Sequence, residues 1–330
     1  MDLDAYTAAH RDEWERLQQL SRRSRFTGAE ADELIDRYQS AATDLSVIRS
    51  SAGHTRQGER VSLYLSRARL RFTGTGTNVL ERIPDFFLRQ VPAALYRIRW
   101  ASIVVALAVV AVAALFFAWA LQGDTLDALM PAAEREQYAN EGFVDYYSEY
   151  SGTSFGTMVW TNNAWIATQC IAFGILGVYT PYILFQNAQG LGMSAAVMAE
   201  QDALDTFFLY ISPHGQLELY AIFVAGAAGL AIFWSWVAPG ARTRGQALAA
   251  GGRSLFTAAV GVTLALFLSG IVEGFVTRQD WPWPIKIGIG TIALAIFLAY
   301  QWILGGRAHR RGVTGDLDEF EAGATRLTAG

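Results

Sequence analysis

Three ionisable residues lie in or beside apolar stretches of this sequence, where their side chains could do chemistry. His214 and Glu218 are four positions apart, so on a helix they face the same way. Glu273 lies inside a separate apolar run, from Leu255 to Val276. A charged side chain in hydrocarbon is costly, so a protein that keeps one there usually has a use for it. We therefore expect these three residues to form one functional or structural site.

Several kinds of chemistry fit this residue set. One imidazole and two carboxylates could bind a divalent metal such as zinc. Because imidazole exchanges protons near neutral pH, the set could also relay protons. It could act as acid and base in an intramembrane enzyme, or simply clamp two helices together as a polar contact. The sequence has no His-Glu-x-x-His motif, nucleophile elbow or nucleotide-binding fingerprint, so the residues favour a non-catalytic role.

The apolar residues that make up 52% of the chain are unevenly distributed. Residues 1–99 are charged throughout and predict a cytoplasmic helical domain that ends in an interfacial helix beside the membrane. Residues 100–304 predict a transmembrane domain, and residues 305–330 a mobile cytoplasmic tail. No basic patch with interleaved aromatic residues occurs, so no nucleic-acid partner is expected.

Local patterns support helices in the first domain. Trp14, Leu17 and Leu20 follow a helical stripe, and the segment from Thr27 to Glu30 has the spacing of a capping box. Further along, glycines recur at the intervals of closely packed membrane helices. The same small-residue faces could make a homodimer.

Hydropathy predicts five clear transmembrane spans. They cover residues 100–121, 164–185, 219–237, 255–276 and 285–304. Arginines before the first span, in the loop 238–253 and after the last span place all three segments in the cytoplasm. That orientation requires an even number of crossings, so we expect a sixth, polar segment at residues 191–211 that is broken or re-entrant. The predicted fold class is an all-α, polytopic membrane helical bundle.

Three separated motifs resemble the stage II sporulation protein M family. The first holds Asn187, Gly190 and Gly192, and the third holds Glu273, Gly274 and Thr277. The second contains His214 and Glu218 with Pro213, Gly215, Gly226 and Gly229. Arg278 stands where the family usually has proline. The pattern around Tyr38 also resembles the longer, actinobacterial members.

The resemblance implies an integral protein of the bacterial cytoplasmic membrane with a role in the cell envelope. The arginine-rich segments place both termini in the cytoplasm, and the apolar spans imply contacts with membrane lipids. Because residues 1–99 are charged and no catalytic motif occurs, we expect a scaffold or assembly factor of the cell envelope, with envelope or membrane proteins as partners. Candidates for these partners are a MoxR-type AAA+ ATPase and an RDD-type membrane protein. The alternative is a transporter or ion- or proton-coupled channel that uses His214, Glu218 and Glu273. A divalent metal at these residues is the one cofactor we consider.

Overall fold

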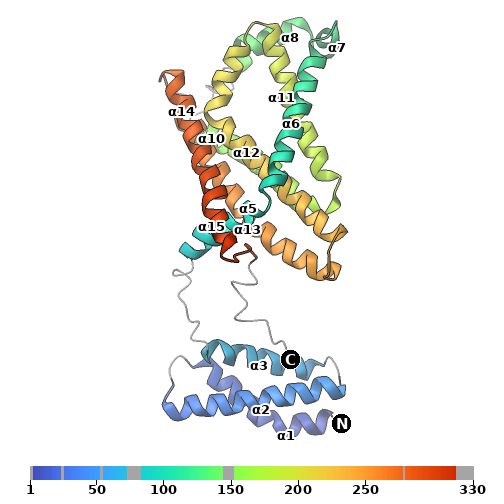
Figure 1. Cartoon of the computed structure of the whole chain (residues 1–330), viewed down its shortest axis with the longest axis vertical. Coiled ribbons are helices and arrows are strands. Elements are labelled where there is room, and N and C mark those ends of the chain that lie inside the picture. Colours follow the sequence, from blue (N-terminus) through green and yellow to red (C-terminus); the bar gives the residue numbers. More distant parts are fainter. Residues whose placement is uncertain are drawn as a thin grey trace. The chain divides into compact units, whose positions relative to one another are not determined.

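The computed structural model describes residues 3–23, 26–52, 55–72, 83–143, 152–277 and 279–316. Regular structure in this part of the chain is entirely helical, which confirms the predicted all-α class (Figure 1). The chain divides into two compact units, Met1–Ile83 with Asp318–Gly330, and Pro84–Leu317. Hydropathy predicts a domain boundary after residue 99, whereas the compact units divide between Ile83 and Pro84.

Unit 1 contains a bundle of three helices, α1 (Leu3–Arg22), α2 (Gly28–Ala52) and α3 (Arg56–Phe72), which pack pairwise. The predicted stripe of Trp14, Leu17 and Leu20 is buried in its core. The predicted capping box is also present at the start of α2. The Thr27 backbone N–H donates to Glu30 Oε2 at 3.0 Å, and the Glu30 N–H donates to Thr27 Oγ1 at 3.3 Å.

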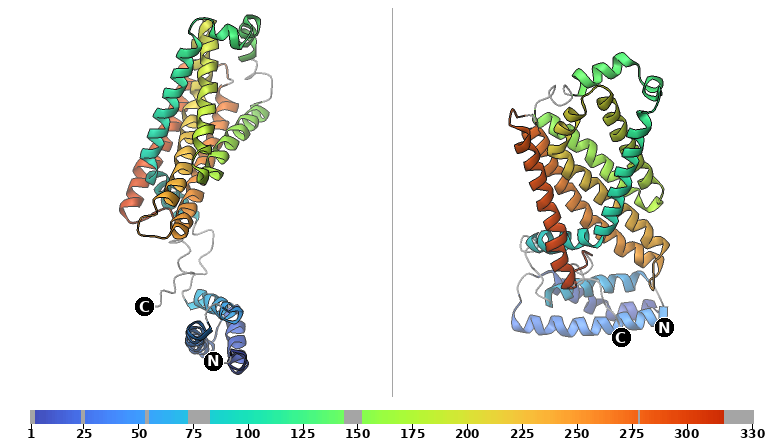
Figure 2. Two further views of the ribbon diagram at one scale, coloured as in Figure 1. Left: turned by 90° about the vertical axis from the view of Figure 1, so that its right-hand side faces the viewer. Right: turned by 45° about the horizontal axis from the view of Figure 1, so that its top comes forward.

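Unit 2 is a helical bundle built around α12 (Figures 1 and 2). Its long helices are α6 (Arg99–Ala120), α10 (Gly152–Ala172), α11 (Tyr179–Glu200), α12 (Leu204–Val237), α13 (Arg244–Val272) and α14 (Trp283–Ala299). Shorter pieces are η1 (Phe86–Gln90), α5 (Val91–Arg97), α7 (Thr125–Leu129), α8 (Ala132–Gln137), η2 (Tyr138–Gly142), η3 (Gly174–Leu176), η4 (Glu273–Thr277), η5 (Tyr300–Leu304) and α15 (Gly305–Arg310). Helix α12 contacts the five other long helices and has the most extensively buried surface.

Four helical stretches of the described residues are long and apolar enough to cross a membrane. They are Arg99–Ala120, Leu204–Val237, Arg244–Thr277 and Trp283–Arg310. Large apolar side chains on their outer faces, such as Val104 and Leu115 of α6, stay exposed in the bundle. An exposed apolar face of this kind suits contact with lipid, as in a membrane protein.

The structure corrects one of the predicted spans and shows a break in a second segment. The apolar run 164–185 is not one helix, because α10 ends at Ala172 and the chain turns through η3 and Gly177, whose φ is 75°. A backbone at this φ favours glycine and cannot continue an α-helix. The run 191–211 is broken, as expected, because α11 ends at Glu200 and α12 begins at Leu204, with a tight corner at Asp202, whose φ is 54°. Its two halves therefore belong to two different long helices.

The segments on either side of the bundle are packed against it. In α5, Val91 and Leu95 are fully buried and contact α13, so the predicted interfacial helix belongs to the core of unit 2. The Arg253 guanidinium binds the Asp316 carboxylate at 2.6 Å. Residues 305–316 of the predicted mobile tail are therefore helical or packed chain, and residues 317–330 lie outside the described part.

Candidate functional site

His214 and Glu218 lie on the buried face of α12. The helix begins at Leu204, so both residues are several turns from its start. Glu273 begins η4, the π-helical turn that extends α13. The exposed fractions of His214, Glu218 and Glu273 are 5%, 8% and 1%, so all three are shielded from the surroundings of the bundle.

The structure brings the three predicted site residues together. Each offers one ligand atom, and these atoms all lie within 4.8 Å of one another. His214 Nε2 is 3.5 Å from Glu273 Oε1. The residues come from two helices that pack side by side along their lengths, which explains how distant sequence positions converge. We refer to His214, Glu218 and Glu273 as the ionisable cluster.

Three further polar residues surround the ionisable cluster. His214 Nδ1 lies 3.3 Å from Thr277 Oγ1. The Ser269 hydroxyl is 3.0 Å from the His214 carbonyl oxygen and 3.5 Å from Glu218 Oε2, so it can donate to either. Lys286, also buried, donates from Nζ to the Thr277 carbonyl oxygen at 2.9 Å and lies over the Trp283 ring. These contacts orient the cluster from α13, η4 and α14.

The arrangement is suited to a cation or a shared proton. Glu273 Oε2 is buried and has no hydrogen-bond partner in the described structure. An unpaired buried carboxylate oxygen is unfavourable, so it demands a proton, a cation or a bound water. The ligand atoms are farther apart than in a formed zinc centre, in which ligands about 2.0 Å from the metal lie roughly 3.3 Å from one another. Small side-chain rotations would be needed to close the site on an ion.

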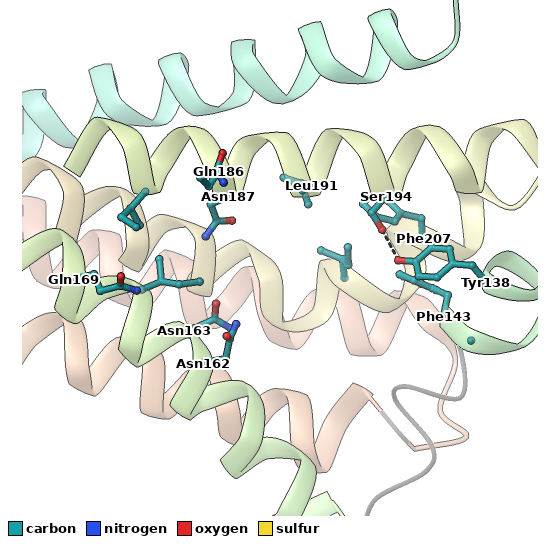
Figure 3. Close-up of a pocket in the computed structure, with 15 residues that line it drawn as sticks. Tyr138, Phe143, Asn162, Asn163, Gln169, Gln186, Asn187, Leu191, Ser194 and Phe207 are labelled. Carbon is teal, nitrogen blue, oxygen red and sulfur yellow. Dashed lines mark hydrogen bonds between the residues drawn. The ribbon is translucent and has the colours of Figure 1, made fainter. Parts of the chain in front are cut away.

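A second feature is a cavity of about 730 Å³ between α10 and α11, which both amide and apolar side chains line (Figure 3). Five amide side chains line it, namely Asn162, Asn163, Gln169, Gln186 and Asn187. The amides lie toward one end of the cavity, and aromatic residues lie at the opposite end (Figure 3). Among these is Tyr138, whose hydroxyl lies 2.6 Å from Ser194 Oγ. We call this feature the amide cavity. Its amides explain why α10 and α11 are less apolar than the helices around them.

Sequence reasoning missed Ser269, Lys286 and most of the amide cavity. One signal for Lys286 was available, because it is the only lysine in the chain. The amides also stand out as polar residues within apolar stretches, in three positions of α10 and three of α11. Which of these amides face one another depends on the packing of the two helices, and the sequence does not contain that information.

The residues of the three family-like motifs fall at two places in unit 2. Asn187 and Gly190 line the amide cavity, while Gly192 faces the Ala113 backbone. The second and third motifs meet at the ionisable cluster.

Some glycines of these motifs allow helices to approach closely, because a Cβ on Gly229 would lie 2.1 Å from the Cys170 carbonyl oxygen. Pro213, Gly215, Gly274 and Thr277 are buried next to the cluster residues, and Gly226 packs against Leu184.

A comparison with known families covers the helices that carry both features. The model described as Stage II sporulation protein M matches residues 103–278, which run from α6 past η4. The chain belongs to the stage II sporulation protein M family. The family region therefore contains both the ionisable cluster and the amide cavity.

The N-terminal helices lie outside this family region. Residues 4–74 match a separate model, described as Domain of unknown function (DUF8413). No curated protein and no solved structure matches the chain. Membership in the stage II sporulation protein M family thus rests on the membrane unit, whose four apolar helices indicate a membrane protein.

Proposed function

We propose that this protein is an integral membrane scaffold of the bacterial cell envelope. The observation that carries the proposal is its division into two units, a charged three-helix bundle and a membrane unit of the stage II sporulation protein M family. A small charged domain attached to a membrane bundle is well suited to dock a partner. The partners we propose are envelope or membrane proteins, including a MoxR-type AAA+ ATPase or an RDD-type protein.

A topology with six crossings accompanies this proposal. The long helices α6, α10, α11, α12, α13 and α14 would each cross the bilayer once. This order leaves the arginines of residues 242–253 and 307–311 on the same side as Arg97, as the positive-inside rule requires. The acidic segment with α7 and α8 would then lie outside, and both termini would lie in the cytoplasm.

The scaffold proposal is tested by capture of partners in a mild detergent. The full chain and a chain lacking residues 1–83 would be expressed at equal levels in the native host and purified through the same affinity tag. We expect envelope proteins with the full chain and loss of most of them from the shortened chain. Membrane fractionation of both proteins is the control. Identical sets of captured proteins, or none at all, would refute docking through unit 1.

A second candidate function is ion or proton handling at the ionisable cluster. The unpaired, buried Glu273 Oε2 next to His214 and Glu218 favours it. The purified protein would be analysed for bound metal and, in liposomes, for flux of protons and divalent cations. Glu218→Gln and Glu273→Gln should abolish either property, whereas Glu200→Gln, outside the cluster, should not. If the unchanged protein shows neither bound metal nor flux, ion and proton handling is refuted, and the cluster is a polar contact that holds two helices together.

Other roles have less support. An intramembrane enzyme would require a reacting group near the cluster, and a bound metal would be the first evidence for one. A homodimer through small-residue faces remains a prediction, because Gly174, Gly192 and Gly229 contact helices of the same chain.

A further inference from the structure

The amide cavity has the properties of a ligand site that is independent of the ionisable cluster. We propose that it binds the uncharged, polyhydroxylated head group of a membrane glycolipid. The ligand class follows from three features of the cavity: unpaired amides, the neutrality of its lining and an apolar groove next to it. The proposal does not depend on the scaffold function.

The first feature is unsatisfied hydrogen-bonding capacity. In the described part of the chain, no side-chain hydrogen bond is made by the amides of Asn162, Gln186 or Asn187. Helices α10 and α11 pack against α6, α12 and α13, all apolar enough to cross a membrane. In the six-crossing topology proposed above, α10 and α11 also cross the bilayer, where water is scarce and unpaired amides are unfavourable. A ligand that both donates and accepts hydrogen bonds would satisfy them.

The second feature is the absence of charge. None of the described residues that line the cavity is an aspartate, glutamate, lysine or arginine. A phosphate or carboxylate group would find no ion pair there, whereas a hydroxyl group pairs with either end of an amide. The aromatic rings of Tyr138, Phe143 and Phe207 close one end of the cavity (Figure 3). Such rings suit the C–H faces of a sugar, and 730 Å³ falls in the range of small-molecule sites.

The third feature favours a lipid over a free sugar. An apolar groove of about 390 Å³ runs between α6, α11 and α12. It shares Leu191, Phe207 and Ile211 with the amide cavity, so the two features are neighbours. A cavity that presents amides beside an entirely apolar groove matches a molecule with a polar head and an acyl chain. Asn162 and Gln186 are exposed at the surface of the bundle, so the head group could enter from the side.

The test uses the full-length protein in detergent and native mass spectrometry to count bound lipid. The probes are a monoglucosyl diacylglycerol, a phosphatidylcholine with the same acyl chains, and free glucose. We expect the glycolipid to be retained in preference to phosphatidylcholine. Asn162→Leu and Asn187→Leu should each weaken its binding by about tenfold, since each removes hydrogen bonds to the head group. Gln189→Leu, which alters an amide of α11 outside the cavity, should have no effect.

A second pair of variants blocks the cavity without removing a polar group. Gly190 lines the cavity and a Cβ on it meets no atom within 4 Å, so Gly190→Leu can add apolar bulk to the lining at a position with open surroundings. Gly288→Leu is the matched control, because Gly288 has equally open surroundings but lies on α14. Size-exclusion profiles and thermal unfolding without lipid would confirm that all variants fold.

The outcomes separate the possibilities. Loss of glycolipid in Gly190→Leu but not in Gly288→Leu would support the proposal. If free glucose binds as tightly as the glycolipid, the cavity is a sugar site, and the proposal that its ligand is a lipid is wrong. Equal retention of phosphatidylcholine and glycolipid, or equal glycolipid binding by Asn187→Leu, Gly190→Leu and the unchanged protein, would overturn it. None of these results depends on whether partner proteins are captured.

Discussion

His214 Nε2 lies 3.5 Å from Glu273 Oε1, and this contact joins the middle of α12 to the turn that ends α13. It also links the second and third motifs of the family region. The pair is almost completely buried, so neither side chain can exchange its partner for bulk water. Removing one of them should therefore affect the other directly.

A double-mutant cycle tests this coupling. His214→Ala and Glu273→Gln should each lower thermal stability in detergent, and the double variant should lose less than the sum of the two. The expected interaction energy is about 1–3 kcal/mol, because the residues share one buried network. A parallel cycle with His214→Ala and Glu134→Gln, on exposed α8, should be additive within about 0.5 kcal/mol. Additivity in both cycles would show that His214 and Glu273 do not interact.

Close helix packing gives a second prediction. The Cβ of Gly229→Ala would lie 2.1 Å from the Cys170 carbonyl oxygen, so α12 and α10 would have to separate. We expect a loss of about 1–3 kcal/mol, typical of an overpacked core, measured by thermal unfolding. Gly252→Ala on α13, where a Cβ meets nothing within 4 Å, should leave stability unchanged or slightly raised. A harmless Gly229→Ala would mean that these helices are not in close contact.

In unit 1, Asp44 accepts hydrogen bonds at 2.8 Å from both the Tyr6 hydroxyl and Trp14 Nε1. Burial, the hydrogen bond to Asp44 and its negative charge raise the pKa of Tyr6 to about 12. Its neutral form therefore contributes stability that is complete below its ordinary pKa of 10.0 and is lost as pH rises toward 12. Asp44→Ala should lower the pKa of Tyr6 in an ultraviolet titration and should flatten the alkaline fall in stability. Unchanged titration curves would exclude the contact.

The stability of unit 1 should also fall at low pH, because two of its carboxylates would then become protonated. The hydrogen bond from the Thr27 N–H holds the pKa of Glu30 below its usual range, and the hydrogen bonds from Arg16 do the same for Glu33. Their contribution is therefore present above the ordinary carboxyl pKa and is lost as pH falls through the lowered values. Circular dichroism at decreasing pH should show the loss, and Glu30→Gln with Glu33→Gln should reduce its pH dependence. Asp36→Asn, for an exposed carboxyl on the same helix, is the control.

Cysteine labelling tests the six-crossing topology. Cys170 is buried, so new cysteines can be introduced against a low background. A membrane-impermeant maleimide added outside intact cells should label Glu134→Cys, before η2, but not Leu176→Cys or Gly245→Cys. All three positions are exposed in the bundle. Labelling at Gly245→Cys from outside would refute the topology, and labelling at Leu176→Cys would refute the placement of the α10–α11 turn.

The predictions that succeeded rest on short-range patterns. The stripe of Trp14, Leu17 and Leu20 and the capping box at Thr27 depend on the period of a helix and on hydrogen bonds within one turn. The long apolar run of α6 likewise predicts a membrane-spanning helix from composition alone. Such features identify helices because neighbouring residues alone decide them.

The error in the predicted spans occurred where hydropathy hides a turn. The run 164–185 remains apolar through Gly177, so no change of composition marks the corner between α10 and α11. In the run 191–211, by contrast, the polar middle predicts the break, and Asp202 lies in the corner before α12. In both places a left-handed backbone at a single residue changes the path of the chain, but only the second corner is marked by polar residues.

The sequence by itself determined that this protein is an all-α membrane protein, and it selected His214, Glu218 and Glu273 through their unfavourable setting in apolar runs. Only the tertiary structure decided that their side chains converge, that Glu273 keeps an unpaired oxygen, and that amides of α10 and α11 face a common cavity. Helical periodicity fixes which face of a helix a residue occupies. The neighbour that covers that face depends on how helices distant in the chain pack, and that is a property of the whole bundle.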